Sequence, residues 1–325
     1  MRRTRLLSII LLTAALAPGL WWRAPEPPRD FQRSVTIRPL AITPERRGPF
    51  TLSAAWELTG DRLEFGGFSA LVARDDRRFL AGSDTGRRLQ FERPDRSAQP
   101  GVLARFADEE ASAKVGRDLE SLAVDPASGT VWGGYEYRKS IVRFDARFNP
   151  DAEVRPAGMR DWEDNAGAET LVRLADGRFL VVEERARRGR GRHHALVFAT
   201  DPVKDRDPAR AIVGIPAGYR PVDGTPIGGG QALVLLRRVV WGIPPGFESA
   251  IAHVNIDRRN PDGSIAARLV TEFGDAIPQE NYEGLALTRD HDGTHLWLIS
   301  DDNFMSTQRT LLLKLRWDQR EKARE

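Results

Sequence analysis

Short apolar stretches separated by polar turns recur along most of the chain. Each stretch starts at a serine or an acidic residue, passes through a few apolar residues, and returns after a turn that contains Asp or Gly. Short strands joined by such turns are typical of β-hairpins. Long stretches with the 3.6-residue apolar period of a helix are absent from the sequence. The pattern therefore predicts an all-β chain.

Five copies of this pattern align, at residues 67–91, 118–144, 167–198, 223–254 and 281–315. Each copy contains three short strand candidates, and a repeat of this size is typical of a β-propeller blade. We predict a β-propeller over residues 34–318, with five visible blades and an estimate of six. Two further strand candidates, residues 34–42 and 50–58, could form the sixth blade or close the ring against the C-terminal strands.

The N-terminus predicts export. Residues 1–5 are basic and residues 6–20 are mostly apolar, which is the pattern of a signal peptide. Trp21 and Trp22 make an uncleaved membrane anchor an equal alternative for residues 1–22. Residues 23–33 form a Pro-rich linker and residues 319–325 a charged tail. We expect the body to be periplasmic or secreted, either free or held at the inner membrane by the N-terminus.

The amino-acid composition argues against several classes of function. The 325 residues carry a net charge of only +3, and the many arginines are dispersed, so we expect no nucleic-acid partner. There is no cysteine, which excludes disulfides, thiolate metal sites and a cysteine nucleophile. We expect a monomer that binds a small anionic ligand or an ester substrate.

Acidic residues stand at corresponding places in the copies. Glu120, Glu169 and Glu283 begin the first strand of their copies, where Asp223 and Ser69 stand in the other two. The first strand of a propeller blade lies innermost, so these carboxylates are expected to meet at the centre. Buried carboxylates repel one another, and a hard divalent cation relieves that repulsion. We predict a Ca²⁺ or Mg²⁺ site whose ligands are Glu120, Glu169 and Glu283.

The second strands end in further polar residues. Glu136, Glu183 with its neighbour Glu184, and Asp301 are candidate ligands or catalytic bases. Arg87, Arg185 and Arg237 are candidate substrate-binding residues, because arginine grips phosphate with two hydrogen bonds. Arg185 opens the basic run 185–194, which is either a solvated loop or a clamp for an anion. The alternative for the whole set is structural: the acids bond to backbone amides or pair with these arginines.

These same segments resemble the phytase-like family, "esterase-like activity of phytase", of exported bacterial propellers. The resemblance covers about residues 50 to 316 and is carried by residues 67–71 with 83–84, 118–123 with 136, 168–169 with 183, and 281–286 with 300–304. It implies a β-propeller and, by analogy with propeller phytases, Ca²⁺ and a phosphoester substrate. The fourth copy, which contains Asp223, departs most from the family pattern.

Three functions remain open from the sequence. The first is a Ca²⁺-dependent hydrolase of phosphate or other esters, and the second is a non-enzymatic propeller with a structural metal that binds a ligand or partner. The third is a lactonase of the gluconolactonase type. A serine hydrolase is not indicated, because no Gly-x-Ser-x-Gly motif occurs. The five histidines form no recognisable triad, and His291 and His295, which flank a turn, are expected at the surface.

Overall fold

The computed structural model describes residues 34–60, 65–106, 118–163, 167–186, 191–242 and 246–319. The predicted signal or anchor segment, the linker, the centre of the basic run and all but the first residue of the tail lie outside these ranges. Within them the chain is built of strands with two short 3-10 turns, Ala157–Met159 and Gly274–Ala276. None of the described helices is long and apolar enough to cross a membrane.

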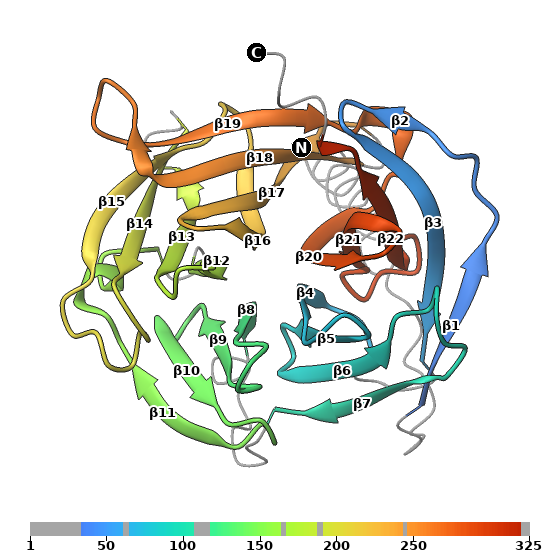
Figure 1. The fold of residues 1–325 in the computed structure, drawn as a ribbon, viewed down its shortest axis with the longest axis horizontal. Coiled ribbons are helices and arrows are strands. Elements are labelled where there is room, and N and C mark those ends of the chain that lie inside the picture. The colour runs from blue at the N-terminus through green and yellow to red at the C-terminus, as the bar shows by residue number, and fades with distance from the viewer. Residues whose placement is uncertain are drawn as a thin grey trace, which may run out of the picture.

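The strands form antiparallel four-stranded blades around a centre, which makes the chain a β-propeller (Figure 1). The blades, each given from its innermost strand outwards, are β4 Phe68–Ala73, β5 Arg78–Ser83, β6 Arg87–Glu92 and β7 Gly101–Arg105; β8 Leu119–Val124, β9 Val131–Tyr135, β10 Ser140–Phe144 and β11 Pro150–Val154; β12 Ala168–Arg173, β13 Phe179–Ala186, β14 Arg192–Phe198 and β15 Ala209–Gly214; β16 Arg220–Gly228, β17 Gln231–Val240, β18 Gly246–Arg259 and β19 Ile265–Glu272; and β20 Asn281–Asp290, β21 Gly293–Asp301 and β22 Thr310–Trp317 with β3 Phe50–Thr59. We number them as the first to the fifth blade.

The N-terminal strand β3 completes the last blade. It pairs with β22 over almost its whole length, from Thr310↔Leu58 to Trp317↔Phe50. On its outer side β3 pairs with β1 Ser34–Leu40 and β2 Arg46–Arg47, and β1 also pairs with β7 of the first blade. Apart from β1 and β2, the described strands therefore fall into five four-stranded blades. The sequence allowed residues 50–58 either to form a sixth blade or to close the ring against the C-terminal strands. In the structure β3 closes the ring by pairing with β22.

Aromatic side chains pack between neighbouring blades. Trp297 of β21 is fully buried and its ring lies 5.0 Å, centroid to centroid, from that of Phe79 in the first blade. Trp132 of β9 packs in the same way on Phe179 of the third blade, at 4.9 Å. Such contacts bury one face of each blade against the next, which an isolated four-stranded sheet cannot do.

The innermost strands are also tied to one another by polar side chains. The Ser69 hydroxyl donates to the carbonyl oxygen of Leu119 at 2.7 Å, from the first blade to the second. The Ser121 hydroxyl donates to the Ala168 carbonyl, from the second blade to the third. An innermost strand has an unpaired edge, and these bonds satisfy part of it. The centre of the ring is therefore held in place by side chains as well as by packing.

Candidate metal centre

Every innermost strand contains a β-bulge at the same place. The register against the second strand shifts around Ser69 in β4, Glu120 in β8, Glu169 in β12, Val222 in β16 and Glu283 in β20. A bulge adds an unpaired residue and bends the strand, and it re-aims the side chain at that position. Three glutamates share this position, and they act on one another: Glu120 is repelled by both Glu169 and Glu283.

The bulges correct the alignment of the fourth blade by one residue. Val222, and not Asp223, stands at the position of the three glutamates. Asp223 is fully buried one step further along β16 and pairs in register with Leu235. Successive residues of a strand point to opposite faces, so the shift gives Asp223 a different environment.

The second strands deliver another set of equivalent residues next to the bulges. Arg237 pairs with Arg220, and Asp301 pairs with Asn281, at the start of the innermost strand. Backbone hydrogen bonds and register place the residues of the other blades opposite Gly67, Asp118 and Gly167. The equivalent residues from the first to the fifth blade are Asp84, Glu136, Glu184, Arg237 and Asp301. We call the carboxylates of both sets, together with Asp118 and Asp302, the central carboxylate cluster.

Three members of the cluster are close enough to share an ion. One carboxylate oxygen each of Asp118, Glu120 and Glu136 lies within 4.8 Å of the other two. Burial and repulsion from Glu169, Asp118 and its other acidic neighbours raise the pKa of Glu120 well above its usual value. Burial and a hydrogen bond with Asp118 raise the pKa of Glu136 to about 8. Asp118 was not among the residues selected from the sequence.

The opposite side of the cluster contains a cation of the protein itself. The Arg237 guanidinium pairs with Glu283 through Nη1 and with Glu184 through Nη2 at 3.2 Å. Its Nη1 also donates to Asn281 Oδ1 at 2.8 Å. Glu169 lies nearby: burial and repulsion from Glu184 and Glu283 raise its pKa, and the charge of Arg237 partly opposes that rise. Arg237 is therefore engaged by carboxylates, although the sequence made it a candidate for binding substrate.

A third group lies where the fifth blade meets the first. Burial and repulsion from Glu283 raise the pKa of Asp301, whose Oδ1 accepts a hydrogen bond from the Asn303 amide at 2.7 Å. Asp302 accepts hydrogen bonds from the amides of Gly67 and Phe304. Gly66 has a φ of 118°, and a Cβ there would lie 2.5 Å from Asp302 Oδ1. A glycine is therefore required for this loop to approach the carboxylate.

Asp223 lies beside an apolar cavity that is lined by the innermost strands. Its Oδ2 accepts hydrogen bonds from the amides of Leu71 and Leu285, at 3.2 and 2.7 Å, and its Oδ1 accepts one from Gly224 at 2.7 Å. Beyond it the channel is mostly apolar: a cavity of about 100 Å³ is lined by all five innermost strands, with residues such as Val72, Val124 and Pro226. The polar centre is therefore confined to one end of the ring.

Three other residues selected from the sequence have described contacts or positions of their own. Glu183 is buried, and its Oε1 accepts a hydrogen bond from the Glu163 amide at 3.4 Å, whereas its neighbour Glu184 contacts Arg237. Arg185 pairs with Glu163 near the surface. Arg87 is buried at the start of β6, the third strand of the first blade. Glu184 is thus the third-blade acid whose position is equivalent to those of Glu136 and Asp301.

The basic run and the histidines differ in part from expectation. Residues 192–194 are not in a loop but begin β14, where His193 is fully buried. His295 is buried as well, with 3% of its surface exposed, whereas His291 is exposed as expected. Burial next to Lys314 lowers the pKa of His295.

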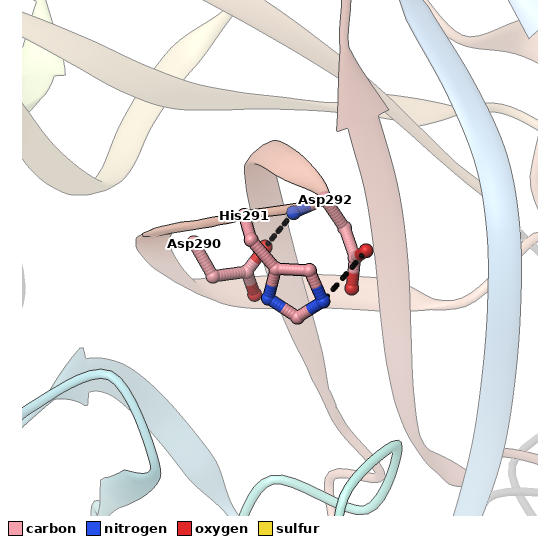
Figure 2. Close-up of side chains that lie close together, drawn as sticks. All are labelled: Asp290, His291 and Asp292. Atoms are coloured by element: carbon pink, nitrogen blue, oxygen red, sulfur yellow. Dashed lines mark hydrogen bonds and ion pairs between the residues drawn. The ribbon is translucent and has the colours of Figure 1, made fainter.

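A second acidic group occupies the turn between β20 and β21. Asp290, His291 and Asp292 lie together there, with the Asp292 amide donating to Asp290 at 2.9 Å (Figure 2). However, Arg93 and Arg96 both contact the Asp290 carboxylate, at 2.8 and 3.0 Å. A metal ion at this turn would face two guanidinium groups, so we assign it no metal.

Comparison with solved structures finds matches of low similarity. "Structure of U3-55K" matches with 9% identity and a TM-score of 0.47, covering 81% of this chain and 98% of the other. "Crystal structure of RRP9 WD40 repeats" matches with 10% identity and a TM-score of 0.44, covering 81% and 97%. "Kuenenia stuttgartiensis Hydrazine Synthase" matches with 14% identity and a TM-score of 0.38, covering 74% and 58%. The fold assignment rests on the strand pairings described above.

Sequence comparison is more specific about the family. No curated protein sequence matches this chain significantly. The family model described as "Phytase-like: Esterase-like activity of phytase" matches residues 63–304, which contain all five innermost strands and the whole central carboxylate cluster. The chain therefore belongs to the phytase-like family.

Proposed function

We propose that this protein is a divalent-cation-dependent hydrolase of phosphate or other esters, with its reaction centre at the central carboxylate cluster. The observation that carries the proposal is the approach of Asp118, Glu120 and Glu136 to within 4.8 Å of one another. Carboxylates that lie this close together, in a site that raises the pKa values of Glu120 and Glu136, are stabilised by a shared cation. The family's description as esterase-like supports hydrolysis of an ester.

The donor set of this group fits a hard cation. All three side chains offer carboxylate oxygens, and neither histidine nor cysteine is among them, which favours Ca²⁺ or Mg²⁺ over Zn²⁺. Glu169 lies next to the group, because it repels Glu120 most strongly of all the charges there. We therefore expect Asp118, Glu120 and Glu136 to hold the ion, and Glu169 to complete its surroundings.

Residues on the other sides of the centre have separate tasks. When bound, a divalent cation polarises the ester oxygen and lowers the pKa of a coordinated water. Asp301 is a candidate for the base that accepts a proton, because its pKa is raised and its Oδ1 is fixed by the Asn303 amide. Arg220 Nη1 contacts Glu184 at 3.2 Å, and half of its side chain is exposed at the rim of the site, where it can meet an anionic substrate.

Replacing Glu120 by glutamine is expected to raise the dissociation constant for Ca²⁺ by at least about tenfold, because one charged ligand is lost while side-chain size is kept. Isothermal titration calorimetry of the full chain with CaCl₂ measures this directly. Asp292→Asn is the matched control, since that exposed carboxylate lies in the β20–β21 turn and should leave the affinity unchanged.

Turnover separates the remaining functions. Phytate, p-nitrophenyl phosphate, a carboxylic ester and a lactone are assayed with Ca²⁺ and after chelation. Ca²⁺-dependent cleavage of a phosphate or carboxylic ester, abolished in Asp301→Asn, supports the proposal. Cleavage of the lactone alone would identify a lactonase of the gluconolactonase type. Ca²⁺ binding that raises the melting temperature without any turnover would make the cation structural and the protein a binding propeller.

A further inference from the structure

The fourth blade breaks the pattern of the other four in two places. At the bulge it has Val222, where three blades have glutamate and the first has Ser69, and at the end of its second strand it has Arg237 where the other four have an acid. Both changes remove a negative charge, and the second adds a positive one. The fourth-blade side of the centre therefore offers fewer negative charges to a cation than the other sides do.

Arg237 fills the gap left by these changes. Only 17% of its side chain is exposed, and its carboxylate partners Glu184 and Glu283 are 8% and 12% exposed. The two partners come from the blades on either side, β13 of the third and β20 of the fifth. The guanidinium therefore bridges carboxylates across the fourth blade, as an ion shared between blades would.

The surroundings of Arg237 would suit a metal ion if the guanidinium were absent. Glu184 and Glu283 offer carboxylate oxygens, and Asn281 offers the amide oxygen that now accepts from Nη1 at 2.8 Å. Glu169 and Asp301 also act on the charge of Arg237. Carboxylate and amide oxygens from several elements are the ligands that Ca²⁺ takes in proteins.

We infer that Arg237 is a built-in cation that takes the place of a second divalent ion and limits the centre to one external cation. The external cation binds at Asp118, Glu120 and Glu136, and the guanidinium compensates Glu184 and Glu283. This inference rests on the proposed function, because it presupposes that the first cation binds. Beyond the proposed function, the inference specifies how many external cations the centre binds and names Arg237 as the residue that sets this number.

The test is the stoichiometry of Ca²⁺ binding, measured by calorimetry on the full chain. The wild-type protein is expected to bind one Ca²⁺, and Arg237→Gln is expected to bind two, because the vacated space is lined by Glu184, Glu283 and Asn281. Arg237→Lys keeps a tethered charge and should still bind one. The matched control is Arg238→Gln, the next residue of β17, which pairs with Glu248 near the surface and should also leave one ion.

Each outcome decides between the two proposals. Wild-type protein that binds neither Ca²⁺ nor Mg²⁺ contradicts the proposed function itself. Wild-type protein that binds two contradicts the inference alone, and this result does not depend on whether any variant folds. One ion in both the wild type and a folded Arg237→Gln also overturns it. Adding Glu184→Gln and Glu283→Gln to Arg237→Gln should return the number to one, which assigns the second ion to these ligands.

Discussion

Replacing Asp223 by alanine is expected to lower the free energy of unfolding by about 3–5 kcal/mol. The carboxylate is fully buried and accepts hydrogen bonds from three backbone amides, those of Leu71, Gly224 and Leu285. These amides belong to the innermost strands of the first, fourth and fifth blades, so one side chain ties three blades together at the centre. Alanine leaves all three donors without this acceptor, in a place from which water is largely excluded. Urea denaturation of both proteins at pH 7 measures the difference.

A graded series tests whether the hydrogen bonds are the cause. Asparagine keeps one acceptor oxygen, which can serve Leu71 and Leu285, and loses only the bond to Gly224, so Asp223→Asn should lose about 1–3 kcal/mol. Asp145 is the matched control: it accepts hydrogen bonds from the amides of Arg147 and Asn149 at 2.8 and 2.9 Å, but in a surface turn. Asp145→Ala should lose less than about 1 kcal/mol. An Asp223→Ala variant as stable as this control would show that the three bonds contribute little.

The sequence predicted the repeat and the convergence of the acids for a physical reason. A glutamate at the start of a Leu-Ala-Val strand is unfavourable unless it has a partner, and finding it three times at the same place indicates a shared environment. The structure brings Glu120, Glu169 and Glu283 within range of mutual repulsion. Blade closure could not be decided in this way, because the pairing of β3 with β22 joins segments more than 250 residues apart.

The differences between the residues aligned from the sequence and those that are equivalent in the structure come from single-residue shifts in register. A bulge shifts which residue faces the centre, and no local pattern marks where the extra residue lies. For this reason Asp223 was aligned with the glutamates in place of Val222, and Glu183 was preferred to Glu184. Asp118 was missed because it precedes its strand, although its position opposite Glu136 brings it together with Glu120 and Glu136. The sequence shows that Arg237 is charged and led to its prediction as a substrate-binding residue. Its contacts with Glu184 and Glu283 show that it is a counter-ion to these two carboxylates.

Closure of the ring depends on a second buried charge, that of Arg93. Its side chain is 0% exposed and pairs with Asp95 at 2.8 Å and with Asp290 of the fifth blade at 2.8 Å. It also donates to the Asp76 carbonyl at 2.9 Å and lies over the ring of Trp297. The first and last blades of the ring thus share one guanidinium, which adds a polar contact to the closure that β3 makes by strand pairing.

Replacing Arg93 by methionine is expected to lower the free energy of unfolding at pH 7 by about 3–5 kcal/mol, because Asp290 then remains buried without its main partner. The matched control is Arg96→Met. Arg96 also contacts Asp290, at 3.0 Å, but 35% of its side chain is exposed, and an exposed pair contributes less than about 1 kcal/mol. Chemical denaturation measures both variants, and equal losses in the two would contradict a special role for the buried pair.

The Arg93–Asp290 pair also predicts how the free energy of unfolding depends on pH. Burial alone would raise the pKa of Asp290, but hydrogen bonds from Arg93, the Asp292 amide and Arg96 outweigh it and hold the pKa below its usual value. A carboxyl whose pKa is lowered by folding stabilises the fold above its unfolded pKa, near 4, and loses this contribution as pH falls. The difference in stability between wild type and Arg93→Met should therefore be constant from pH 7 to about 5 and shrink below about 4. A difference that grows in acid would mean that Asp290 is not the group that Arg93 stabilises. In that case the loss at pH 7 would come from the packing of Arg93 on Trp297.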